Sequence, residues 1–244
     1  AAWRRPTYVS LQGHDQTHFW RRANWSALPA DLRVTVFEMS DGSVAARGWP
    51  TPEPNARHVH DATTWIDDPR VRALFVSNPA SFHPKLAAYP RALFDTRRWE
   101  AALRGSVAQP RRARSKLLFC NCMRYKYGRT AKLDALRRNG FACASPCERY
   151  ADEMLISKFV FSPWGNGHNN HREWEALLAG AIPLVDYDPV LVSLWDTLPV
   201  VQVCNWSDVT PTYLRRLWQS MQARNYSWAK AYFPYWLDQL LFAR

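Results

Sequence analysis

One short apolar segment and one helical pattern stand out in the second half of the chain. Residues 157–162 form an apolar run that ends before Pro163, which is typical of a buried strand. From His171 onward, apolar residues recur every three or four positions, which predicts a helix that Gly180 ends. The predicted buried face of this helix consists of Trp174, Leu177, Leu178 and Ala181. Residues 182–185 then predict a second strand.

Similar patterns predict elements on both sides of this segment. Residues 116–122 (KLLFCNC) predict a strand, and an amphipathic helix that ends at Gly140 follows it. Residues 105–115 (GSVAQPRRARS) have the composition of a linker, which predicts domains over residues 1–105 and 116–244. The other predicted strands are residues 7–11, 32–39, 74–76 and 198–203. The other predicted helices are a short helix from Asp67, residues 210–224, and residues 227–242, with a kink at Pro234.

The segment before the His171 helix has the composition of a ligand-binding loop. Residues 164–170 (WGNGHNN) contain two glycines, three asparagines and a histidine, which tolerate tight backbone and offer short polar groups. A strand that leads through such a loop into a helix presents backbone N–H groups and the positive end of the helix dipole, where a phosphate binds. Arg172 is then expected to pair with phosphate oxygens, and Glu175 to accept hydrogen bonds from sugar or ribose hydroxyls. The alternative is an Arg–Glu pair on a solvated helix face.

Two further loops offer groups for the same chemistry. Arg124, Lys126 and Arg129 lie in or just after the loop that follows the predicted strand of residues 116–122, in a position to meet a diphosphate. They could equally be solvated basic side chains. His14 and Asp15 lie in a polar loop after the first predicted strand, where a general base could act.

Residues 161–185, FSPWGNGHNNHREWEALLAGAIPLV, resemble the signature of exostosin-like glycosyltransferases. The similarity is to divergent, family 47-like members from algae, protists and algal viruses, in which a strand ending in S-P leads through G-N-G to an H-R-x-W-E-A-L helix and a G-x-I-P strand. Weaker similarity extends to residues 67–86, 116–141 and 198–206.

This resemblance implies an α/β protein of the GT-B type, with two Rossmann-like domains facing a cleft. The implied activity moves a sugar from a nucleotide-diphosphate sugar, with UDP as the expected nucleotide, to a glycan hydroxyl. Residues 1–105 would form the acceptor side, with His14 or Asp15 as the base, and residues 116–244 the donor side with the C-terminal helices. The implied donor-binding residues are Arg124, Arg129, Ser162, Gly165, Asn166, Gly167, His171, Arg172 and Glu175, and Arg129 best matches the family's donor-contacting loop arginine.

The sequence gives less support to a divalent-metal site or a zinc site. Asp186, Tyr187 and Asp188 spell D-x-D, the pattern with which another transferase class holds a divalent metal. Because exostosin-like enzymes do not depend on such a pair, no cofactor or metal is expected, and Asp186 and Asp188 are the fallback ligands. The five cysteines, Cys120, Cys122, Cys143, Cys147 and Cys204, lack zinc-knuckle spacing, which favours a local disulfide or buried thiols over zinc.

The charge and composition of the chain restrict which classes of partner are expected. The net charge of +11 is spread over scattered arginine clusters without a nucleic-acid motif, so nucleic acid is not an expected partner. The sequons at Asn24, Asn205 and Asn225 hint at a secretory history, with a Golgi or secretory lumen for a cellular protein and the host cytoplasm for a viral one. The chain begins without methionine, which leaves open a membrane anchor outside it. A non-catalytic glycan-binding or scaffold protein and a basic nucleic-acid-binding module are the alternative functions.

Overall fold

The computed structural model describes residues 7–12, 24–27, 30, 32–39, 43–45, 59–61, 63–91, 93, 96–107, 114–120, 128–143, 149–165 and 167–242. Contacts divide the chain into two compact units. The first unit comprises Ala1–Pro90, Asp188–Asp196 and Trp228–Arg244, and the second comprises Arg91–Tyr187 and Thr197–Ser227. Of the predicted site residues, His14, Asp15, Arg124 and Asn166 lie outside the described residues.

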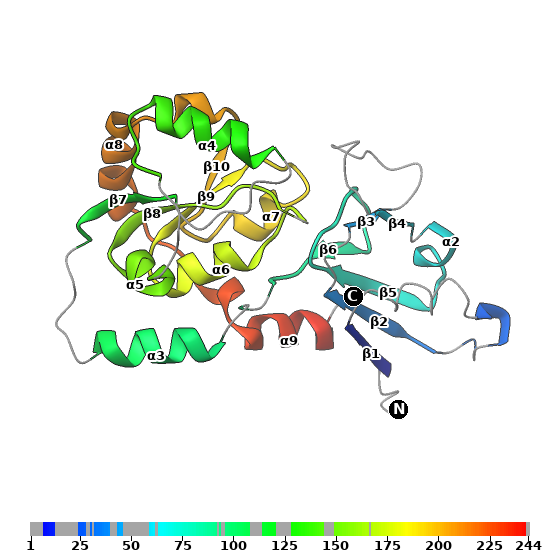
Figure 1. The fold of residues 1–244 in the computed structure, drawn as a ribbon. Helices are drawn as coiled ribbons and strands as arrows, with labels where there is room; N and C mark the ends of the chain where they lie inside the picture. The colour runs from blue at the N-terminus through cyan, green and yellow to red at the C-terminus, as the bar shows by residue number, and fades with distance from the viewer. Residues whose placement is uncertain are drawn as a thin grey trace. The chain divides into compact units, whose positions relative to one another are not determined.

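The first unit contains a parallel sheet with the strand order β1-β2-β5-β6 (Figure 1). Its strands are β1 Thr7–Gln12, β2 Val34–Met39, β5 Val71–Val76 and β6 Leu86–Ala88. A separate parallel pair joins β3 Ser43–Ala45 to β4 Val59–Asp61. The described helices of this unit are η1 Trp25–Ala27, α2 Thr63–Ile66, α7 Val192–Trp195, η3 Ala229–Ala231 and α9 Phe233–Phe242.

The second unit contains a parallel sheet with the order β10-β9-β8-β7. Its strands are β7 Lys116–Phe119, β8 Ser157–Phe161, β9 Ile182–Asp186 and β10 Val201–Val203. Its described helices are α3 Thr96–Val107, α4 Arg129–Arg138, α5 Tyr150–Leu155, α6 His171–Leu178, η2 Trp206–Asp208 and α8 Pro211–Gln222. The α/β class is therefore confirmed, and the parallel sheets are compatible with two Rossmann-like domains.

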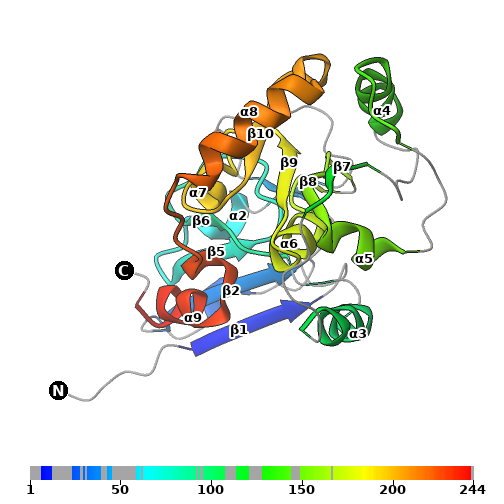
Figure 2. The ribbon, with the colours of Figure 1, turned by 90° about the vertical axis from the view of Figure 1, so that its left-hand side faces the viewer.

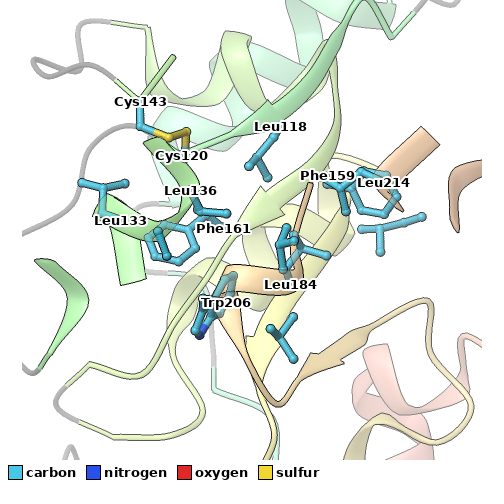
Figure 3. Close-up of a cluster of buried hydrophobic side chains, with 14 of the residues drawn as sticks. Leu118, Cys120, Leu133, Leu136, Cys143, Phe159, Phe161, Leu184, Trp206 and Leu214 are labelled. Atoms are coloured by element: carbon cyan, nitrogen blue, oxygen red, sulfur yellow. A yellow bond between two sulfur atoms is a disulfide. The ribbon is translucent and has the colours of Figure 1, made fainter. Parts of the chain in front are cut away.

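Alternating side chains on the strands of the second unit build two cores, one on each face of the sheet. Leu118, Phe159, Phe161 and Leu184 pack with residues of α4 and α8 (Figure 3). The neighbouring strand positions Phe119 and Val160 pack on the opposite face, with residues of α3, α5 and α6. This two-residue period is what a sheet buried on both faces requires. Figure 2 shows the resulting layers, with α4 and α8 on one side of the sheet and α5 and α6 on the other.

The division into units differs from the predicted division at residues 105–116. The helix α3 continues through Val107, and its Trp99 is buried in the core of the second unit together with Phe119 and Met154. At the other end of the chain, Trp236 of α9 lies edge-on to Phe75 and Tyr89, which ties the C-terminal segment to the first unit. A linker-like composition therefore did not mark the boundary, because large buried aromatic residues decide which core each helix joins.

Several local predictions are confirmed and others are corrected. Gly140 and Gly180 adopt positive φ angles of 89° and 69°, as helix-ending glycines do. Leu178, predicted to be buried, is 41% exposed. No helix begins at Asp67, because residues 67–70 form a turn before β5 in which Asp68 accepts two hydrogen bonds from the Arg70 guanidinium. The predicted kink at Pro234 is replaced by a helix start, since α9 begins at Phe233.

A disulfide joins Cys120, just after β7, to Cys143, which follows α4, with 5.1 Å between the Cα atoms (Figure 3). Cys204 is a free, exposed thiol, and Cys122 and Cys147 lie outside the described residues. No cluster of His, Cys, Asp and Glu that could hold a metal occurs among the described residues. None of the described helices has the length and apolar character needed to cross a membrane.

Candidate functional site

The candidate site lies in the second unit, where β8 and β9 end. Ligands of open parallel α/β sheets bind outside the carboxyl ends of the strands. Here the β8–α6 loop, residues 162–170, leaves β8 at that edge and leads into α6. The loop contains the Gly/Asn segment singled out in the sequence, and two side chains of α4 hold it from the other side of the sheet.

Asp186, the last residue of β9, anchors this loop. Its Oδ2 accepts hydrogen bonds from the Trp164 backbone N–H and from Lys132 Nζ, both at 2.7 Å. Its Oδ1 accepts a 2.6 Å hydrogen bond from Trp206 Nε1. Charge-assisted hydrogen bonds of this length are among the stronger ones in proteins, so Asp186 fixes where the loop leaves the sheet.

Arg129, at the start of α4, holds the loop at the next residues. Its Nε donates a 2.6 Å hydrogen bond to the Trp164 carbonyl oxygen. A Cβ atom at Gly165 would lie 2.1 Å from Arg129 Nη2 and 2.6 Å from Asn170 Oδ1. A side chain at Gly165 would therefore force the Arg129 guanidinium and the Asn170 side chain to move, while the Gly165 amide donates to the Gly167 carbonyl oxygen at 2.9 Å.

We expect Gly165→Ala to destabilise the protein by about 1–3 kcal/mol, because the added methyl group overpacks the contact with Arg129. Urea denaturation measures this free energy. The matched test adds Gly165→Ala to an Arg129→Ala background, where the clash with the guanidinium is absent and the cost of the methyl group should be smaller. An equal cost in both backgrounds would show that Arg129 is not the group that excludes a side chain at Gly165.

A capping box closes the N-terminus of α6. Asn170 is the N-cap residue, and its backbone N–H donates to Glu173 Oε2 at 3.0 Å while its side-chain amide donates to Oε1 at 3.2 Å. Glu173 is completely buried, and this burial raises the pKa of its carboxyl group from 4.5 to about 8 against the opposing effect of these hydrogen bonds. The cap is therefore mostly uncharged at neutral pH.

Ser162, at the start of the loop, carries a buried hydroxyl next to this carboxyl group. The Ser162 hydroxyl lowers the pKa of the Glu173 carboxyl group, against the larger effect of burial. Ser162 therefore belongs to the polar surroundings of the α6 cap.

Aromatic rings line the loop itself. Trp164 and His168 stack with their ring centroids 4.0 Å apart and 6° between the ring planes, and Lys132 Nζ lies 5.1 Å from the Trp164 ring centroid. Asn169 is buried and accepts a 2.7 Å hydrogen bond from Trp174 Nε1 of α6. The loop is consequently held by side chains along its whole described length.

Arg172 and Glu175 of α6 share a tyrosine partner. Tyr150, at the start of α5, donates a 2.5 Å hydrogen bond from its Oη to Glu175 Oε2, and Glu175 is only 5% exposed. The Arg172 guanidinium carbon lies 5.2 Å from the Tyr150 ring centroid and 5.7 Å from that of Phe119. Burial, with the neighbouring carboxylate, raises the pKa of the Tyr150 hydroxyl, so it remains a donor to Glu175 at neutral pH.

Two more arginines contact His171 or Tyr150. Arg91 Nε donates a 3.0 Å hydrogen bond to His171 Nε2, which makes this ring nitrogen an acceptor. The Arg98 guanidinium carbon lies 5.7 Å from the Tyr150 ring centroid. We refer to Arg91, Arg98 and Arg172, each of which contacts His171 or Tyr150, as the α6 arginine cluster.

The structure brings most described members of the predicted donor site into one region. Arg129, Ser162, Gly165 and Gly167 belong to the β8–α6 loop or contact it, and His171, Arg172 and Glu175 follow on α6. The residues that the sequence prediction did not assign to the site include Arg91, Arg98, Lys132, Tyr150 and Glu173. Only Glu173 had a sequence signal, since N-x-x-E before an apolar run is a capping-box pattern.

The two fallback metal ligands have protein partners. Asp186 carries the three hydrogen bonds described above, and Asp188 is buried and accepts a 2.9 Å hydrogen bond from the Val190 backbone N–H. The latter contact starts the turn that leads into α7. Both carboxylates of the D-x-D pattern thus accept hydrogen bonds that hold the surrounding backbone and side chains in place.

Comparisons with known proteins assign no family. No protein-family model matches the chain, and no curated protein shows significant similarity to it. A function for the chain therefore has to be argued from the site.

Proposed function

We propose that the protein is a glycosyltransferase of the exostosin-like, GT-B type, which binds a nucleotide-diphosphate sugar at the carboxyl edge of the second sheet. The observation that carries this proposal is the α6 arginine cluster. Arg172 lies in the first turn of a helix that follows a parallel strand through a Gly/Asn loop, Arg91 donates to His171 in the same turn, and Arg98 contacts the Tyr150 ring that Arg172 also contacts. A diphosphate is the ligand that this combination of charge and helix N-terminus favours.

The local charge balance supports an anionic ligand. Glu175 is hydrogen-bonded to Tyr150, and the carboxyl group of Glu173, with a pKa of about 8, is mostly protonated at neutral pH. Glu173 therefore adds little negative charge that would oppose a phosphate at this turn. The positive end of the α6 dipole and the α6 arginine cluster remain as the dominant charges.

The reaction follows from this placement. An acceptor hydroxyl oxygen forms a bond to the anomeric carbon of the donor sugar, and the bond from that carbon to the diphosphate oxygen breaks. The nucleoside diphosphate leaves with the electron pair, and a base takes the hydroxyl proton. The arginines and the helix N-terminus stabilise the negative charge that develops on the leaving diphosphate. His14 and Asp15 stay the predicted bases.

We expect Arg172→Ala to weaken binding of UDP by about ten- to a hundredfold, the range for loss of one charge-assisted hydrogen bond. Isothermal titration calorimetry measures the affinity, and the melting temperature shows whether the variant is folded. Arg216→Ala is the matched control, because Arg216 is an exposed arginine of α8 in the same unit. Equal UDP affinity in the Arg172 variant and the parent protein would place the phosphate site elsewhere.

Turnover separates an enzyme from a non-catalytic glycan-binding protein of the same fold. The intact chain is incubated with a panel of nucleotide sugars and glycan acceptors, and the released nucleoside diphosphate is measured. Release that requires both donor and acceptor is expected for a transferase. Donor binding without release under all these conditions would favour the non-catalytic alternative.

A further inference from the structure

The hydrogen-bond donors around Asp186 determine whether its carboxylate can bind a metal ion. A carboxylate has about four lone-pair positions, and the Trp164 amide, the Trp206 indole and the Lys132 ammonium use three of them. A bound Mg²⁺ would require near-octahedral oxygen ligands at about 2.0–2.1 Å. A divalent cation at Asp186 would have to displace an ammonium group that already lies 2.7 Å from Oδ2. The side chains around this aspartate therefore do not fit a metal ligand.

Lys132 has the position and exposure of a fixed cation. It lies in the N-terminal half of α4, and its side chain remains 22% exposed although its ammonium group pairs with Asp186. The same ammonium lies 5.1 Å from the Trp164 ring centroid, in the range of a cation–π contact. Two partners thus hold the charge beside the β8–α6 loop, where solvent still reaches the side chain.

We propose that Asp186 is not a metal ligand but a positioning residue. It holds Trp164 and fixes the Lys132 ammonium at the carboxyl edge of the sheet, where Lys132 meets an anionic ligand. That this ligand is a nucleoside diphosphate rests on the proposed function. The positioning of the loop by Asp186 is independent of it. Neither residue has to contact the reacting atoms for this role, because Asp186 acts through Lys132 and Trp164.

The test uses three variants and one matched control in the intact chain. Lys132→Met removes the charge, Lys132→Arg keeps a charge that can pair with Asp186, and Asp186→Asn removes the carboxylate. Asp134→Asn is the control, because Asp134 lies on the same helix in an exposed pair with Arg137 at 3.0 Å. Three quantities are measured: the UDP affinity by calorimetry with and without EDTA, the binding of Mn²⁺ alone by electron paramagnetic resonance, and the hydrogen exchange rate of the Trp164 amide.

We expect Lys132→Met to weaken UDP binding about tenfold, as loss of a charged hydrogen bond does, and Lys132→Arg to restore most of the affinity. The control variant should bind UDP like the parent protein, and EDTA should change none of these affinities. Asp186→Asn should exchange the Trp164 amide at least about tenfold faster than the parent, because its carboxylate acceptor is lost. A variant that lost only stability would not show rescue by Lys132→Arg.

Other outcomes would overturn the proposal. Binding of Mn²⁺ to the parent protein that Asp186→Asn abolishes would make Asp186 a metal ligand. Unchanged UDP affinity in Lys132→Met would remove Lys132 from the site. If the parent protein bound no nucleoside diphosphate, the proposed function would fail, whereas the Mn²⁺ and Trp164 exchange measurements would still decide the role of Asp186. If Asp186→Asn did not fold, Lys132→Met and the Mn²⁺ measurement on the parent protein would decide it.

Discussion

We expect the stability of the protein to fall as the pH rises from about 4.5 to about 8, and we expect replacement of Glu173 with glutamine to remove this fall. Burial raises the pKa of this carboxyl group from 4.5 to about 8 in the folded protein. Between these values the folded protein keeps a proton that the unfolded chain has released. Stability therefore decreases with increasing pH across this interval and levels off above it.

The glutamine variant has no carboxyl group to titrate, so its unfolding free energy should lack this slope. Above pH 8 we expect it to gain on the order of a few kcal/mol relative to the parent, because the folded parent must then ionise a buried group. At pH 5 it should be about 1 kcal/mol less stable, since the new amide group cannot accept both Asn170 hydrogen bonds.

Urea denaturation at a series of pH values measures this difference. Glu153→Gln is the matched control, because Glu153 is a partly exposed glutamate of the same unit that pairs with Lys116. The control should keep the decline between pH 4.5 and 8. An unchanged decline in Glu173→Gln would mean that another group is responsible for it.

We also expect removal of the Cys120–Cys143 disulfide to lower the free energy of unfolding substantially. The bond joins residues 23 apart in the sequence, and closing a loop of this length restricts the unfolded chain by about 3 kcal/mol. Both half-cystines are buried in the core formed with α4 and α8. We expect the Cys120→Ala, Cys143→Ala double variant to lose about 3 kcal/mol of unfolding free energy.

Chemical denaturation of the double variant is compared with that of the parent protein in the presence and absence of a reductant. The reductant should destabilise the parent by a similar amount and leave the double variant unchanged. Cys204→Ala serves as the control, because Cys204 is a free, exposed thiol and its loss should alter neither curve. A reductant-insensitive parent would argue against the disulfide.

Local patterns in the sequence were sufficient to predict most strands and helices of the second unit. The strands β8 and β9 and the start of α6 agree with the predicted ranges to within one residue, because buried strands and a glycine-ended helix have strong periodic patterns. Leu178 shows the limit of this approach. Its helical spacing predicted burial, yet the core space beside α6 is filled by Trp174 and Leu177.

The polar part of the site could not be predicted in the same way. Glu175 was assigned to a ligand because its spacing from Arg172 suggested a shared cleft, but its partner in the structure is Tyr150, 25 residues earlier in the chain. In the sequence, Asp186 belongs to a D-x-D pattern that suggests a metal ligand. In the structure its partners are Lys132 and Trp206, which reach it only because α4 and η2 pack on the sheet. Such hydrogen bonds depend on tertiary packing, which no local pattern records.

The assignment of α9 to the first unit has a consequence for synthesis on the ribosome. Ser227 completes the second unit, whereas the first unit, whose sheet is made from the earliest part of the chain, also includes Trp228–Arg244. Trp236 can pack against Phe75 and Tyr89 only after both units have otherwise been translated. Of these two units, the one whose sheet is translated earlier is therefore completed later, because α9 is translated after the whole of the second unit.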